Sequence, residues 1–332
     1  MSFVTRNRFA GEPFQDCDEV IAQALEEVSI PALMCSLVHM SGDPAWARGE
    51  IQPNVAVSLD IQGAMSEEDM AEVRRRAVPV IAAYRDNGCV PVELSHDLLQ
   101  EMMGFLGRRP VEGRLAGLFF DDLQFEGDDR GKISWGDEVS PRQRAETPVV
   151  VIGCGMGGIL AGIRLKQAGL PFTIIEKNPG PGGAWWENRY PGARVDVGSH
   201  QYCFSFEPAD LWSEYYSQQP ELCRYFGAIA DKYDLGSHCL FETAVTELVW
   251  QEERSMWRVR VRDAHGTERT TEARFVLSAV GSLNLPRFPQ IRGMETFDGP
   301  SFHSARWPQD LDISGTRFAL ANTGWTTVQG SE

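Results

Sequence analysis

The clearest repeating pattern of apolar and polar residues lies in the first third of the chain. In one segment, apolar side chains recur at the spacing of a helix face, at Met70, Val73, Ala77 and Ile81. Ser66 stands three residues before Asp69, a spacing that favours a helix N-cap, and Ser95 is placed to cap a second helix. The pattern predicts a mostly α-helical domain over residues 1–125.

A different pattern begins after a polar stretch at residues 126–146. This stretch is rich in Gly, Asp and Pro and has no periodicity, which is typical of a linker or an extended arm. A β-branched run from Val149 to Ile152 then predicts a buried parallel strand. The run leads directly into the G-x-G-x-x-G spacing of Gly153, Gly155 and Gly158, and an apolar helix follows.

The next strand ends at Glu176, about twenty residues after the glycines. In this order of elements the glycines allow a tight turn and bring a pyrophosphate to the start of the helix, while the acid meets the ribose hydroxyls. A carboxylate at Glu176 would repel a phosphorylated ribose. The residues alone therefore favour FAD or NAD at this site over NADP.

Residues 241–281 alternate between apolar and polar side chains, with turn signals at residues 252–255 and at 265–266. This alternation predicts a β-meander. The predicted fold class is α/β, a Rossmann-like domain preceded by a mostly helical domain.

Composition and charge disfavour several kinds of partner and binding site. The 332 residues include 47 acidic and 31 basic side chains, for a formal net charge of -16, which disfavours nucleic acid as a partner. The seven cysteines include no C-x-x-C pair, so we expect neither a disulfide framework nor a metal site. We find no signal-peptide pattern and no apolar run long enough for a membrane span, and we expect a cytoplasmic protein.

Two further motifs carry a family resemblance. The first has the form GG-x-W followed by N-x-YPG-x-R-x-D, at Gly182, Gly183, Trp185, Asn188, Tyr190, Pro191, Gly192, Arg194 and Asp196. The second has the form F-x-G-x-x-x-H-x-x-x-W-P, at Phe297, Gly299, His303, Trp307 and Pro308. In both motifs the chain resembles the flavin-dependent Baeyer-Villiger monooxygenases.

The resemblance implies a cofactor, a reaction and roles for individual residues. It implies FAD as the bound cofactor, with NADPH as reductant, and O2 and a small-molecule ketone as substrates that give an ester. It adds Gly183, Trp185, Asp196, Tyr202 and Val245 to the cofactor-binding residues, and it makes Asp196 catalytic through an arginine that it holds. Phe297, Gly299, His303 and Trp307 would have a conformational role in the linker between the FAD and NADPH domains.

The two ends of the chain extend this resemblance. Residues 29–46 resemble the N-terminal extension of the branch that oxidises 4-hydroxyacetophenone, which suggests an aryl ketone and self-association as a homodimer through this region. The predicted domains are then an FAD-binding domain at 147–296, a fingerprint linker at 297–314 and the start of an NADPH-binding domain at 315–332.

In that last segment only Gly324 matches a fingerprint glycine, because Asn322 and Thr327 occupy the other two places. We expect the NADPH domain to be truncated and the chain alone to be inactive. The alternative function is a non-catalytic FAD-binding remnant or module that associates through its helical region.

Overall fold

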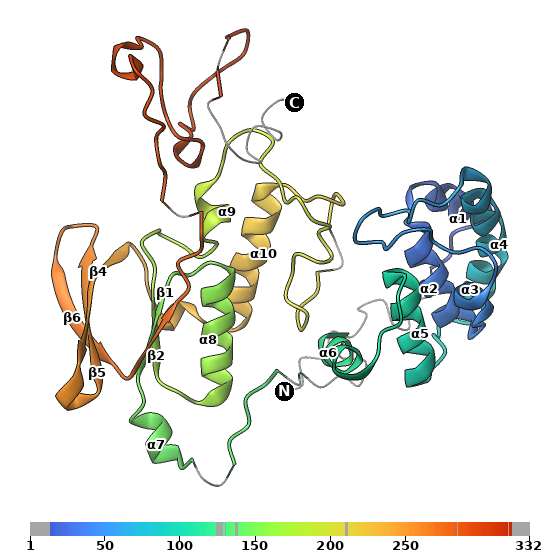
Figure 1. The fold of residues 1–332 in the computed structure, drawn as a ribbon, viewed down its shortest axis with the longest axis horizontal. Coiled ribbons are helices and arrows are strands. Elements are labelled where there is room, and N and C mark those ends of the chain that lie inside the picture. The colour runs from blue at the N-terminus through green and yellow to red at the C-terminus, as the bar shows by residue number, and fades with distance from the viewer. Residues whose placement is uncertain are drawn as a thin grey trace. The chain divides into compact units, whose positions relative to one another are not determined.

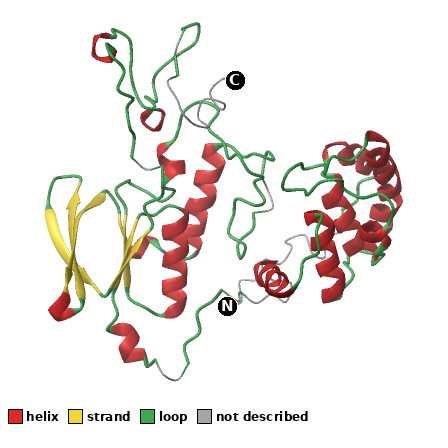
Figure 2. Ribbon diagram, in the orientation of Figure 1, coloured by secondary structure: helices red, strands yellow, loops and turns green. Residues whose placement is uncertain are grey.

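The computed structural model describes residues 14–123, 129, 131–136, 139–209, 212–283, 285–317 and 319–320. The chain divides into two compact units, Met1–Asp129 and Arg130–Glu332. The regular structure of the first unit is helical, whereas the second combines helices with strands (Figure 2). Within the described residues, no helix combines the length and the apolar character needed to cross a bilayer.

The first unit is built from short helices around one apolar core. They are α1 (Asp18–Ala24), η1 (Leu25–Glu27), α2 (Ile30–Ser41), α3 (Ala45–Arg48), α4 (Glu67–Asp86), α5 (His96–Gly107) and α6 (Gly113–Leu123). The predicted apolar face of α4 is buried in this core, through Met70, Val73, Ala77 and Ile81. As predicted, the Ser66 hydroxyl accepts a hydrogen bond from the Asp69 amide at 3.1 Å, and the Ser95 hydroxyl caps α5 through the Leu98 amide.

The polar stretch at residues 126–146, which was predicted to be a linker or an extended arm, contains helix α7 (Pro141–Ala145). Helix α7 begins with a capping box, in which the Ser140 side chain and the Gln143 side chain satisfy each other's backbone amides. Pro141 stands in the first turn, where its fixed φ suits a helix. Local capping therefore forms a helix despite the absence of an apolar period.

The second unit contains a parallel four-stranded sheet with the strand order β3-β2-β1-β7. Strand β1 (Val149–Ile152) lies between β2 (Phe172–Ile175) and β7 (Phe275–Ser278), and β3 (Cys239–Leu240) pairs with the far side of β2. Helix α8 (Met156–Ala168) connects β1 to β2 and ends at Gly169, which has a φ of +68°. The predicted strand-helix-strand unit is confirmed.

The sheet is covered on both faces, which explains the uninterrupted apolar run of β1 (Figure 1). Val149 and Val151 pack with α8 and with α10 (Gln219–Lys232). Val150 points to the opposite face, where it packs against Val259 and other residues of a second sheet.

The second sheet is the predicted meander, with antiparallel strands β4 (Thr243–Gln251), β5 (Met256–Asp263) and β6 (Glu268–Ala273). Its first turn contains η3 (Glu252–Arg254), and its second contains Gly266 with a φ of +83°. The prediction was wrong at the last strand, because β7 pairs with β1 in the parallel sheet. Strand β7 ends at Ser278.

The remaining short elements are α9 (Ala184–Glu187), η2 (Gly236–His238), η4 (Met294–Thr296) and η5 (Ser304–Arg306). The predicted NADPH-site positions Asn322, Gly324 and Thr327 lie outside the described residues.

Candidate dinucleotide-binding site

The site is built on the turn of residues 153–158, here called the glycine turn, which joins β1 to α8. Gly153 has a φ of +100°, which few other residues adopt. A Cβ at Gly158 would lie only 1.8 Å from the Gly153 carbonyl oxygen. The first turn of α8 therefore packs on the glycine turn at a distance that only glycine allows.

The start of α8 has no side-chain cap. Gly155 is the N-cap and has no side chain, so no side-chain hydrogen bond caps this helix end. Free N–H groups and the helix dipole attract a negatively charged group such as a pyrophosphate. The glycine spacing therefore leads to an uncapped helix start, and the binding of an anion there stays a prediction.

Glu176 lies directly against the glycine turn. Its side chain is buried, at 4% exposure, and its Oε2 accepts a hydrogen bond from the Cys154 amide at 2.6 Å. Its Oε1 accepts from the Asn178 amide at 2.8 Å. Each carboxylate oxygen has a further lone pair. The acid and the glycines thus form one site, and a contact to ribose hydroxyls stays a prediction.

Cys154, inside the glycine turn, contributes no negative charge. A hydrogen bond to Cys239 and burial raise the pKa of the Cys154 thiol, so the thiol is neutral at physiological pH. The same hydrogen bond lowers the pKa of Cys239. A neutral side chain beside the helix start avoids repulsion of a phosphate group.

The second glycine cluster lies against the first. The Gly182 amide donates a hydrogen bond to the Cys154 carbonyl oxygen at 2.9 Å. A Cβ at Gly183 would lie 2.8 Å from the Gly155 Cα, so the two backbones approach as closely as glycines permit. The family motif that begins here is therefore part of the same site.

Trp185 and Tyr202, both predicted as cofactor-binding residues, meet each other. The Trp185 Nε1 donates to the Tyr202 hydroxyl at 3.1 Å, and the rings lie edge to face with centroids 5.7 Å apart. Tyr202 in turn contacts Phe226 of α10. This packing fixes the chain just beyond the second glycine cluster.

Val245 lies near the end of β2, because the start of β4 is hydrogen-bonded to Glu176. The Thr243 amide donates to the Glu176 carbonyl oxygen at 2.9 Å, so β4 begins where β2 ends. Val245 is half-buried and packs with Ile175 and the second sheet. The structure thus brings the predicted residue to the acid end of the site, and its contact with a cofactor stays a prediction.

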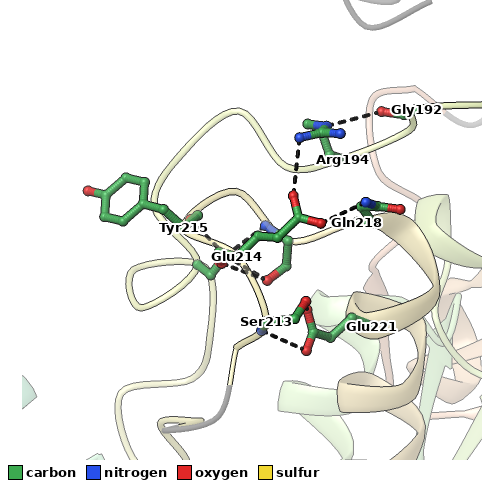
Figure 3. Close-up of polar contacts among 9 residues, drawn as sticks. Gly192, Arg194, Ser213, Glu214, Tyr215, Gln218 and Glu221 are labelled. Carbon is green, nitrogen blue, oxygen red and sulfur yellow. Dashed lines mark hydrogen bonds and ion pairs between the residues drawn. The ribbon is translucent and has the colours of Figure 1, made fainter. Parts of the chain in front are cut away.

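Asp196 is exposed. Arg194, two residues before it, takes part in the polar contacts drawn in Figure 3. Arg194 forms an ion pair with Glu214 at 3.3 Å, and Gln218 donates to the same carboxylate at 2.7 Å. The Val195 amide also donates to the Ser217 carbonyl oxygen at 3.0 Å. The loop residues around Asp196 are therefore ordered by side chains that no sequence motif indicated, while its own carboxylate faces solvent.

The residues of the second family motif form a separate segment, 297–308, here called the fingerprint segment. Phe297 is 65% exposed. The His303 Nδ1 accepts a hydrogen bond from the Ala305 amide at 3.1 Å, and its ring contacts Phe288. Trp307 packs against Phe302, with ring centroids 5.0 Å apart. These residues do not lie against the glycine turn itself.

One contact of the fingerprint segment reaches the site. Arg306 pairs at 2.9 Å with Glu187 of α9, which follows the second glycine cluster. A depression of about 440 Å³ lies at this junction and is lined by Lys177, Asn178, Trp186, Glu187, Ala305, Arg306 and Trp307. A larger depression of about 650 Å³ lies in the first unit and contains none of the predicted site residues.

The second unit contains a Rossmann-like domain. The family of NAD(P)-binding Rossmann-like domains matches residues 151–218, which include the glycine turn and Glu176. The uncharacterized monooxygenase y4iD of Sinorhizobium fredii is 30% identical over 311 residues, which cover 93% of this chain and 46% of that protein.

Other relatives match a smaller part of the chain. A Baeyer-Villiger monooxygenase of Pseudomonas aeruginosa is 37% identical over 198 residues, covering 59% of this chain and 37% of the relative. A crystal structure of OTEMO in complex with FAD and NADP is 36% identical, with a TM-score of 0.52, and covers 56% of this chain and 36% of that one. The chain is thus a homologue of Baeyer-Villiger and other flavin-dependent monooxygenases, and it spans less than half the length of these relatives.

Proposed function

We propose that the chain is the FAD-binding part of a Baeyer-Villiger monooxygenase that uses NADPH and O2 to convert an aryl ketone into an ester. The observation that carries this proposal is the contact between Glu176 and the Cys154 amide, which unites the acid and the glycine turn. The relatives named as monooxygenases supply the reaction class.

The residues present fit FAD. The start of α8 carries no side-chain cap, and the thiol beside it is neutral, so a pyrophosphate fits there. Glu176 would accept hydrogen bonds from the adenosine ribose through its remaining lone pairs. We propose as cofactor-binding residues Gly153, Gly155, Gly158, Glu176, Gly183, Trp185, Asp196, Tyr202 and Val245.

When bound, FAD would take electrons from NADPH and activate O2 for insertion beside the ketone carbonyl. The protein's own residues would position the cofactor and exclude water. Trp185 and Tyr202 hold each other edge to face beside the second glycine cluster, so they would shield one side of the site. Asp196, with its exposed carboxylate, would hold an arginine side chain near the reacting atoms.

We further propose that the chain as printed does not complete an oxygenation alone. The chain spans 46% of the relative from Sinorhizobium fredii and 36% of OTEMO, and in the predicted NADPH-site segment only Gly324 matches a fingerprint glycine. The match over 93% of this chain to a longer monooxygenase favours the enzyme over a separate FAD-binding module, because both units of this chain occur together there. Homodimerisation through the first unit and a cytoplasmic location stay predictions.

The test is an absorbance spectrum of the purified chain with added FAD, followed by NADPH and 4-hydroxyacetophenone. We expect a flavin spectrum that remains with the protein after gel filtration and no ester product. Ester formation would contradict the proposed inactivity, and a colourless protein would contradict the FAD site. Size measured in the same gel filtration decides self-association.

A further inference from the structure

Glu187, like Glu176 and Glu207, is an acidic residue whose side chain is buried. It ends the short helix α9, and its side chain is 7% exposed. Its Oε1 accepts hydrogen bonds from the Lys177 Nζ at 2.8 Å and from the Asn178 Nδ2 at 3.1 Å, and its Oε2 accepts from the Arg306 Nη1 at 2.9 Å. One buried carboxylate therefore joins three partners.

These partners come from two different parts of the unit. Lys177 and Asn178 directly follow Glu176, whose carboxylate contacts the glycine turn. Arg306 is 119 residues away from Glu187 in sequence and belongs to the fingerprint segment. The Glu187 side chain is thus a direct link between the predicted ribose end of the site and the fingerprint segment.

The charge of Glu187 is maintained by its partners. Burial alone would raise the pKa of this carboxyl group, but the hydrogen bonds from Lys177, Asn178 and Arg306 outweigh burial and lower it. Glu187 is therefore ionised at neutral pH. A buried charge that loses one of its partners is strongly destabilised, so the network favours the arrangement in which Arg306 stays in place.

This network differs from the ordinary surface ion pairs of the same unit. In the pair of Arg254 and Glu272, the side chains are 55% and 38% exposed, and such pairs contribute little. Arg306 is itself 50% exposed, but its acceptor is not. Loss of the contact is therefore costly mainly because it deprives the buried carboxylate of Glu187 of one of its charged partners.

We propose that Glu187 is a positioning residue, which fixes the fingerprint segment, through Arg306, to the residues that directly follow Glu176. The part of this inference that concerns FAD rests on the proposed function. Ordering of η5 and occupation of the site are then thermodynamically coupled, because Lys177 and Asn178 are adjacent to the residue that would bind the ribose.

The role of Glu187 in the absence of FAD is tested by hydrogen exchange of the intact chain, measured for each peptide. In η5 the Arg306 amide donates to the His303 carbonyl oxygen at 2.7 Å, and the Trp307 amide donates to the Ser304 carbonyl oxygen at 3.2 Å. We expect Arg306→Gln to speed exchange of the segment about fivefold, since a half-exposed charged hydrogen bond is lost. Arg306→Lys should restore much of the protection, and the matched control Arg254→Gln should leave the segment unchanged.

Exchange in β5 serves as the reference for correct folding of each variant. Glu187→Gln provides the second variant, and it should speed exchange in the fingerprint segment at least as much as Arg306→Gln does. Unchanged exchange of the segment in both variants would overturn the proposal. Equal acceleration in Arg254→Gln would overturn it too, since any lost ion pair would then have the same effect.

Added FAD tests the coupling separately. In the wild-type chain FAD should slow exchange of the fingerprint segment, and in Arg306→Gln this slowing should be largely lost. If the wild-type chain takes up no FAD, the proposed function fails, while the ligand-free exchange still decides the role of Glu187. If FAD binds and the segment exchanges at an unchanged rate, the coupling is refuted.

Discussion

The glycine turn and the fingerprint segment both carry family motifs, yet they are held in place in opposite ways. The glycine turn is fixed by backbone contacts that exclude any Cβ at Gly158, and by a buried carboxylate. About half of the fingerprint segment is exposed, and it is linked to the rest of the unit by the Arg306 ion pair and the ring contact of His303 with Phe288. The difference indicates that the glycine turn tolerates changes of side chain less well than the fingerprint segment does.

The largest expected effect is at the glycine turn. In Gly158→Ala the new Cβ would overlap the Gly153 carbonyl oxygen at 1.8 Å, so we expect a loss of at least about 3 kcal/mol in the free energy of unfolding. The control Gly227→Ala lies in α10, where a Cβ meets nothing within 4 Å, and should stabilise by about 0.5–1 kcal/mol. Urea unfolding measures both, and similar values for the two variants would contradict a rigid turn.

Substitution of Glu187, which links the two regions, should have the next largest effect on the free energy of unfolding. This effect should also depend on pH. We expect Glu187→Gln to cost about 1–3 kcal/mol at pH 7, because charged hydrogen bonds become neutral ones. The folded-state pKa of Glu187 is lowered from 4.5, so its contribution is present above that pH and is lost as the pH falls through the lower folded value. Unfolding at pH 7 and at pH 3.5 should show the difference between wild type and variant shrinking in acid.

A smaller effect is expected at the ring contact beside the second glycine cluster. Tyr202→Phe removes the acceptor of the Trp185 Nε1 and should cost about 1 kcal/mol. Tyr216→Phe, at a side chain that is 44% exposed, is the control and should be neutral. Thermal unfolding followed by tryptophan fluorescence compares them, and equal melting temperatures would show that this contact does not hold the site.

The smallest effect is expected in the fingerprint segment itself. Phe297 is 65% exposed, so Phe297→Ala should change the free energy of unfolding by no more than about 0.5 kcal/mol. A large loss in urea unfolding would mean that the segment is as firmly packed as the glycine turn, and the contrast between the two regions would disappear.

The glycine turn was predictable from sequence because its interactions are local. The spacing of Gly153, Gly155 and Gly158, the β-branched run before them and the acid after the second strand all describe one strand-helix-strand unit. The structure confirms these elements and brings Glu176 to the Cys154 amide. Because these interactions are short-range, few other folds are compatible with this part of the sequence.

The remaining features depend on pairings between distant residues. Alternating apolar residues fit either sheet, so the sequence did not show that β7 joins β1 instead of extending the meander. Arg306 and Glu187 are each ordinary charged residues in sequence, and nothing in their neighbourhoods indicates that they meet across 119 residues. Glu214, which orders the loop before Asp196, belongs to no motif either.

Calorimetric titration of FAD into the wild-type chain and into Glu176→Gln tests the main conclusion most directly, with Glu272→Gln as an exposed control. We predict binding at one site per chain, weakened at least about tenfold in Glu176→Gln and unchanged in the control, because an NH2 donor would replace one of the two carboxylate oxygens that accept from the Cys154 and Asn178 amides. Equal affinities for the wild type and Glu176→Gln would contradict the proposed site.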